Sequence, residues 1–84
     1  MKKIAYSKDA LRTLKSLPVN VRKLIVSKIE LYAENPKALE NNLKALKGGN
    51  GEFRLRVGDW RIVMTDNDTV VVVIKVGPRG SVYH

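Results

Sequence analysis

Three arginines recur over a short stretch of the chain, and arginine is the side chain best suited to binding phosphate. Arg54 and Arg56 are separated by one residue, and Arg61 follows shortly after them. A guanidinium group presents forked N–H donors that match the oxygens of a phosphate, and it stays charged because its pKa exceeds about 12. If these three side chains share one surface, they predict an external anion as the ligand, with phosphate as the best fit.

The residues around the arginines have the pattern of a β-hairpin, which decides whether they share a surface. Charged and apolar residues alternate over 53–57, as in a half-buried strand, and 60–65 form the return strand. Gly58-Asp59 suits a two-residue turn, which pairs Arg56 with Arg61. Directly paired residues lie on the same face of a sheet. The arginines therefore share one face, and the face expected to meet the helices carries Phe53, Leu55, Val57, Trp60, Ile62 and Met64.

A valine-rich segment at 70–76 predicts the next strand, because β-branched residues favour extended structure. A three-residue loop at 66–68 pairs Arg61 with Val73 and directs Lys75 to the arginine face, whereas a two-residue loop buries Lys75. We therefore expect the three-residue loop, with core residues Val70, Val72, Ile74 and Val76. The open face then carries Arg54, Arg56, Arg61 and Lys75, with Val63, Val71 and Val73 between them.

Alternating charge on a strand is most often only a solvated surface, but three features of this strand pair argue against that interpretation. Here the charges all have one sign, and Arg56 opposite Arg61 is a like-charge pair that costs stability. The nearest acids, Glu52 and Asp59, lie at the strand ends. Exposed valines on the same face indicate a partner that covers part of it. The pattern therefore favours an anion-binding surface.

The first half of the chain predicts two helices that cover the apolar sheet face. Residues 3–6 are expected as a short strand, followed by Ser7 as the N-cap of a helix that Pro18 ends at Leu17. A second helix is expected from Val19 or Asn20 to Glu34. Residues 37–47 are open between a helical turn and a loop.

The predicted fold class is therefore α+β, as one domain that spans residues 1–84. The elements follow in the order β-α-α-β-β-β, and the helical hairpin packs on one face of a small antiparallel sheet. The other face of the sheet is expected to be open and basic. A chain of 84 residues is too short for a Rossmann domain or a TIM barrel.

Composition narrows the classes of partner and site. Sixteen Lys and Arg against eight Asp and Glu give a net charge of +8, which favours an anionic partner. The absence of cysteine excludes disulfides, thiolate metal sites and cysteine nucleophiles. The sequence has no P-loop, HExxH motif or metal-ligand cluster, so no metal, cofactor or small-molecule substrate is expected. No apolar run approaches the roughly 20 residues of a membrane span, so we expect a cytoplasmic protein without a membrane partner.

With this organisation, the sequence resembles the RelE/ParE superfamily of bacterial toxins from type II toxin–antitoxin systems over nearly the whole chain. The segments that carry the resemblance are Leu46-Lys47-Gly48, Phe53 to Val63, the valine strand, Val76-Gly77-Pro78-Arg79, and Tyr83. It implies an antitoxin that wraps the toxin, and the basic face suits an acidic segment that folds on binding. RelE-like toxins cut mRNA in the ribosomal A site. ParE-like toxins inhibit DNA gyrase and use no RNA-cleaving site.

On the RelE branch, the resemblance implies roles for the matching residues. RNA is cleaved without a metal when its 2′-OH attacks the neighbouring phosphate. Arg61 and Arg79 would stabilise the charge of the phosphorane, and Tyr83 would be the base. The pKa of Tyr83, ordinarily near 10, must then fall by several units, which clustered arginines would promote. The residues implied to position the RNA are Arg54, Arg56 and Lys75.

Two further residues are candidates because the chain departs from the best-known RelE pattern. Glu52 stands where that pattern has a lysine, and it either acts as a base or offsets charge at the strand start. Some relatives use an acidic residue with a terminal His-Tyr pair, whereas this chain ends in the reverse order, Tyr83-His84. The acid for the leaving group is unassigned. We expect a RelE-like mRNA endonuclease, with ParE-like gyrase inhibition as the alternative and a non-toxic nucleic-acid-binding module as the third hypothesis.

Overall fold

A five-stranded sheet forms the centre of the computed structural model, which describes residues 2–46 and 51–78. The elements in chain order are β1 (Lys3–Tyr6), α1 (Lys8–Ser16), α2 (Val19–Glu34), the 3₁₀ helix η1 (Pro36–Asn42), β2 (Leu43–Ala45), β3 (Phe53–Val57), β4 (Trp60–Asp66) and β5 (Val70–Pro78). The predicted α+β class, with a helical hairpin ahead of a strand meander, is confirmed.

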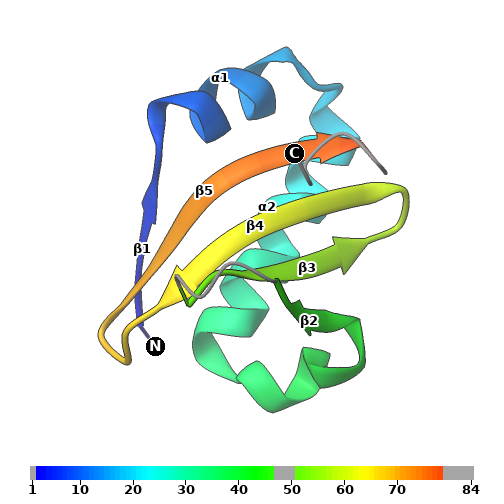
Figure 1. Ribbon diagram of the computed structural model, residues 1–84. Helices are drawn as coiled ribbons and strands as arrows, with labels where there is room; N and C mark the ends of the chain where they lie inside the picture. The colour runs from blue at the N-terminus through cyan, green and yellow to red at the C-terminus, as the bar shows by residue number, and fades with distance from the viewer. Residues whose placement is uncertain (1, 47–50, 79–84) are drawn as a thin grey trace.

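The sheet has the strand order β1-β5-β4-β3-β2 (Figure 1). β3, β4 and β5 form the predicted antiparallel meander, and β2 extends it antiparallel to β3. β1 pairs in parallel with β5, where Ile4 lies opposite Val71, so the complete sheet is mixed. A parallel pair needs a long connection between its strands, and the segment from α1 to β4 provides it.

One apolar core fills the space between the helices and one face of the sheet. The helices bury Ala10 and Leu14 of α1 and Ile25 and Ile29 of α2. The sheet contributes Leu55, Ile62, Met64, Val71, Val73 and Val76. In Figure 1, α2 crosses behind β3 and β4. The helices therefore pack on one face of the sheet, as predicted.

Local sequence signals fix the ends of α1. The Ala10 amide donates a hydrogen bond of 3.0 Å to the Ser7 Oγ, which confirms Ser7 as the N-cap. Pro18 disfavours helical geometry at Leu17, and α1 ends at Ser16. The sequence therefore determines both ends of this helix within a residue.

A β-bulge in β5 changes the register predicted for that strand. Val63 pairs with Lys75 and Met64 with Val73, so Ile74 has no partner on β4. The predicted register from a three-residue loop was wrong, because four residues separate Asp66 from its partner Val71 and the bulge then adds one further residue to β5.

The bulge lets both halves of β5 bury valines. Val71 and Val73 are fully buried before the bulge, and Val76 is buried after it. The expected core residues Val70 and Val72 are only half-buried. An odd shift in register exchanges the two faces of a strand, so the faces predicted for 70–73 were reversed. The exposed valines expected on the open face were wrong, because Val71 and Val73 lie in the core and Val63 is buried.

The same bulge keeps Lys75 on the face away from the helices, as predicted. Arg61 pairs with Gly77, and its predicted pairing with Val73 was wrong. The Ser7 Oγ donates a hydrogen bond of 2.6 Å to the carbonyl of Ile74. Ser7 therefore caps α1 and also donates a hydrogen bond to the carbonyl of Ile74, the bulge residue without a partner on β4.

The ambiguous segment after α2 forms η1 and then β2. Pro36 begins η1, and Leu39 is its buried residue. Leu43 of β2 lies opposite Leu55 of β3, and the Leu46 amide donates to the Glu52 carbonyl at 3.0 Å. Within the described part of the chain, no helix is long and apolar enough to cross a membrane.

Candidate functional site

The β3–β4 hairpin positions the arginines, and its register is as predicted. Val57 pairs with Trp60 across the turn, and Arg56 pairs with Arg61. Gly58 has a φ of 58°, in the left-handed region that glycine enters without steric cost. This turn fixes Arg56 beside Arg61 on the sheet face that points away from the helices.

A second row of residues crosses four strands next to the Arg56–Arg61 pair. Lys44 of β2 pairs with Arg54 of β3. Arg54 also pairs with Val63 of β4, which in turn pairs with Lys75 of β5. Because paired residues share a face, both rows lie on the same side of the sheet. We call Lys44, Arg54, Arg56, Arg61 and Lys75 the basic sheet face.

The members of the basic sheet face differ in exposure. Those that are exposed are Lys44, Arg56 and Lys75. Arg54 is half-buried, whereas Arg61 on the central strand is only 8% exposed. Its neighbour on that strand, Val63, is 4% exposed. Solvent therefore reaches the basic sheet face at Lys44, Arg56 and Lys75, whereas Arg61 on the central strand is enclosed.

The Arg61 guanidinium is anchored to its own hairpin. Its Nη1 donates to the Gly58 carbonyl at 2.9 Å and to the Trp60 carbonyl at 3.0 Å. Its Nε is buried and has no hydrogen-bond partner among the described residues. A buried donor without a partner costs stability and calls for an explanation. The guanidinium is therefore a fixed, enclosed positive charge on the central strand.

The structure brings some of the predicted site residues together and does not describe others. Those on one face are Arg54, Arg56, Arg61 and Lys75. Arg79, Tyr83 and His84 lie outside the described residues, so their assigned roles stay predictions. Glu52 is half-buried immediately before β3, and its role as base or charge offset also stays a prediction.

Lys44 is the one member of the basic sheet face that the sequence did not reveal. It is the middle residue of β2, which contains only three residues. So short a segment does not establish an alternating pattern. Its position could have been predicted from the pairing of Leu43 and Ala45 with the apolar residues of β3. That pairing places Lys44 on the same face as the arginines.

Similarity to known proteins extends over nearly the whole chain. The family model described as the ParE toxin of type II toxin–antitoxin systems, parDE, matches residues 4–83. The chain belongs to this toxin family. Toxin RelE3 of Methanocaldococcus jannaschii is 31% identical over 84 residues, which cover 96% of this chain and 94% of that relative.

Solved structures share the fold of the toxin. The RelB–RelE antitoxin–toxin complex from Methanococcus jannaschii matches with a TM-score of 0.72 and 30% identity over 94% of each chain. The intact E. coli RelBE toxin–antitoxin complex matches with a TM-score of 0.75 and 26% identity, covering 93% of this toxin and 96% of that chain. The predicted membership of the RelE/ParE superfamily is confirmed.

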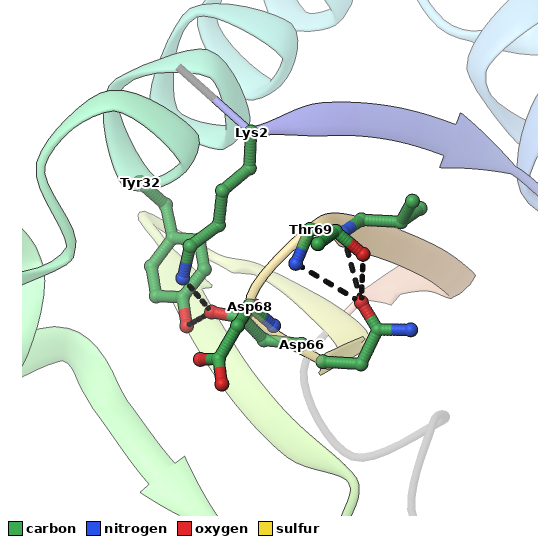
Figure 2. Close-up of polar contacts among 7 residues, drawn as sticks. Lys2, Tyr32, Asp66, Asp68 and Thr69 are labelled. Carbon is green, nitrogen blue, oxygen red and sulfur yellow. Dashed lines mark hydrogen bonds and ion pairs between the residues drawn. The ribbon is translucent and has the colours of Figure 1, made fainter.

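A second polar cluster ties the start of the toxin to the β4–β5 turn (Figure 2). The Asp66 Oδ2 accepts hydrogen bonds from the Lys2 Nζ at 2.6 Å and from the Tyr32 hydroxyl at 2.7 Å. The Asp66 Oδ1 accepts one from the Asp68 amide at 3.0 Å. We call Lys2, Tyr32 and Asp66 the Asp66 cluster.

The surroundings of the Asp66 cluster shift the pKa of Asp66 and of Tyr32. Burial alone would raise the pKa of Asp66, but the hydrogen bonds from Lys2, Tyr32 and the Asp68 amide hold it below its usual value. Burial, followed by the hydrogen bond to Asp66, raises the pKa of Tyr32. Among the described residues, no group of three or more acidic or histidine side chains is placed to hold a metal ion. The hydrogen bonds of the cluster join Lys2 and α2 to the β4–β5 turn.

Proposed function

We propose that this toxin is a ribosome-dependent endoribonuclease that cleaves mRNA and thereby inhibits translation. The observation that carries the proposal is the Arg56–Arg61 pair, with further cations on the same face. Like charges directly opposite each other destabilise a sheet. An RNA phosphate bound between them would offset that repulsion. Relatives named RelE favour this branch of the superfamily.

The proposed chemistry is an attack of the RNA on itself. The 2′-oxygen bonds to the adjacent phosphorus, the bond from phosphorus to the 5′-oxygen breaks, and a 2′,3′-cyclic phosphate and a 5′-hydroxyl result. We assign Tyr83 as the base that takes the 2′-OH proton. The 5′-oxygen gains its proton from a general acid, for which His84 has a suitable ordinary pKa near 6.5. Glu52 is the alternative candidate for the base.

Arg61 suits the stabilisation of the phosphorane because its guanidinium is already fixed. Charge stabilisation is strongest when the donors need no reorganisation and water is excluded. The two bonds from Nη1 to the hairpin carbonyls hold the group and fix its positive charge on the central strand. Arg79 would supply the second charge. Arg54, Arg56 and Lys75 would position the backbone of the RNA.

The proposal includes an antitoxin that holds the toxin inactive in the cytoplasm. Solved relatives are toxin–antitoxin complexes with RelB. The toxin carries a net charge of +8, so an acidic antitoxin segment would be attracted to it. Binding of such a segment over Arg56 and Lys75 would neutralise their charge and exclude RNA.

The alternative is inhibition of DNA gyrase without catalysis. The description of the matching family model as a ParE toxin favours it, and so does Glu52 in the place of a lysine. A gyrase supercoiling assay with micromolar toxin separates the two functions. Inhibition of supercoiling would support the alternative, and unaffected supercoiling would reject it.

Mapping of mRNA 5′ ends on purified ribosomes tests the cleavage proposal. We expect wild-type toxin to produce new 5′ ends within the A-site codon, and no cuts in the same mRNA without ribosomes. Tyr83→Phe should lose these cuts, whereas Lys23→Gln, at an exposed position of α2, should retain them. Folded wild-type toxin that produces no A-site cuts would overturn the proposal.

A further inference from the structure

Lys44 lies on the basic sheet face, but the chemistry above gives it no role. It is exposed, and it belongs to β2, which is an edge strand of the sheet. Its direct partner across the sheet is Arg54. The apolar neighbours of Lys44 along β2 pair with apolar residues of β3, so its own side chain is on the face away from the helices.

The Lys44–Arg54 pair is the second like-charge pair on this face, after Arg56–Arg61. Directly opposite residues have Cβ atoms about 5 Å apart, and diagonal neighbours are about 7–8 Å apart. Arg56 is diagonal to Lys44, so three cations gather at the β2–β3 edge. None of the described partners that pair β2 with β3, or β3 with β4, is acidic.

Protection of the sheet edge is the simplest alternative explanation for Lys44. A charged side chain on an edge strand prevents edge-to-edge association of sheets. An acidic residue at this position would protect the edge equally well and would also attract Arg54. Edge protection and phosphate binding are compatible roles for this side chain, and what distinguishes Lys44 is its place in one row with Arg54 and Lys75 on the same face.

We propose that Lys44 is a positioning residue that binds a phosphate of the mRNA on the β2 side of the basic sheet face. The inference rests on the proposed function, because it takes the RNA to be the ligand of that face. The row from Lys44 through Arg54 to Lys75 crosses three strand spacings, about 14 Å, which is long enough for an extended RNA backbone to follow. Lys44 lies two strands away from Arg61, so the phosphate assigned to it is not the one that reacts.

Steady-state cleavage on programmed ribosomes gives the main test. Lys44→Gln should raise KM about 10-fold, the usual effect of losing a charged hydrogen bond, and change kcat by less than about 2-fold. Lys44→Arg should restore KM, because it keeps the positive charge. Lys23→Gln, with the same change of charge on the exposed side of α2, should leave both parameters unchanged.

Binding of a single-stranded RNA oligonucleotide with 2′-O-methyl groups, which cannot be cleaved, gives an independent readout. The slope of log affinity against log salt should fall by about 0.7 in Lys44→Gln, the value for one lost phosphate contact on a single strand. An unchanged slope with a raised KM would overturn the mRNA contact and assign it to ribosomal RNA.

The remaining outcomes separate this inference from the proposed function. Active wild-type toxin with an unchanged KM and slope in Lys44→Gln would overturn the role of Lys44 and leave the cleavage proposal intact. Inactive wild-type toxin whose oligonucleotide slope still falls in Lys44→Gln would overturn the cleavage proposal and support the RNA contact of Lys44.

Discussion

The two charged clusters of this toxin are organised in opposite ways. In the Asp66 cluster, one carboxylate accepts hydrogen bonds from Lys2 and Tyr32, and its pKa falls below the usual value. On the basic sheet face, Arg56 is paired with Arg61. The first arrangement adds to the stability of the fold, and the second subtracts from it. A stable fold gains nothing from the second arrangement, which therefore indicates a ligand.

Reversal of one charge on the basic sheet face should have the largest effect. Arg56→Glu changes the repulsive pair with Arg61 into an attractive one, so the free energy of unfolding should rise by about 0.2–1 kcal/mol. Cleavage at subsaturating ribosome concentration should fall about 10- to 100-fold, because a charged contact to phosphate is lost. Urea unfolding and cleavage assays measure the two effects, with Lys23→Glu as the control. Lower stability with unchanged cleavage would contradict a ligand-binding face.

Removal of the carboxylate from the Asp66 cluster should affect stability alone. Asp66→Asn should lower the free energy of unfolding by about 2 kcal/mol, because a partly buried ammonium and a hydroxyl lose their charged acceptor. Its kcat should stay within about 2-fold of the wild-type value. Asp59→Asn, at an exposed turn position, should change stability by less than about 0.5 kcal/mol. Equal stability of the Asp66 and Asp59 variants would show that the cluster is not structural.

Ser7 links the start of α1 to the bulge that keeps Lys75 on the basic sheet face. Ser7→Ala removes the N-cap acceptor and the donor to Ile74, and should cost about 1–2 kcal/mol of unfolding free energy. Ser16→Ala is the matched control, since its Oγ donates only to the exposed Thr13 carbonyl. A Ser7 effect no larger than that of Ser16 would contradict the anchoring of the bulge by α1.

Acid should remove the contribution of Asp66 to stability. Its pKa is lower in the folded protein than the ordinary 3.8, so the unfolded chain binds more protons between these two values. The contribution is complete above about pH 5, one unit above the ordinary pKa, and is lost as the pH falls through the folded pKa. Urea unfolding from pH 7 to 3 should therefore show a constant gap between wild type and Asp66→Asn above about pH 5, which narrows below pH 4. A gap that does not change with pH would contradict the shift.

Short-range signals in the sequence were sufficient for the hairpin that carries the arginines. Gly58-Asp59 fixes the pairing of Arg56 with Arg61, because a two-residue turn leaves one register. Ser7 and Pro18 likewise determine the ends of α1 through contacts within a few residues. These parts of the fold and site were predictable because neighbouring residues decide them.

The parts that were missed depend on residues far apart in the chain. Successive valines at 70–73 look alike on both faces of a strand, and the face that is buried depends on the length of the turn at 67–70 and on the bulge at Ile74. The carbonyl of Ile74 accepts a hydrogen bond from Ser7, 67 positions away in the chain. β2 has three residues and is recognisable only through its pairing with β3. Lys44 was missed for that reason. The burial of Arg61 depends on bonds between its side chain and backbone carbonyls, which alternation does not reveal.

The most direct test of whether the two clusters have different roles is a comparison of mRNA cleavage rates on purified programmed ribosomes. The rates of the Arg61→Ala and Asp66→Asn variants are measured at equal concentrations of folded toxin. We predict A-site cuts at similar rates for wild type and Asp66→Asn, and a rate about 100-fold lower for Arg61→Ala, as expected when a charge stabiliser of the transition state is lost. No A-site cleavage by the folded wild type, or equal losses in the two variants, would contradict this prediction.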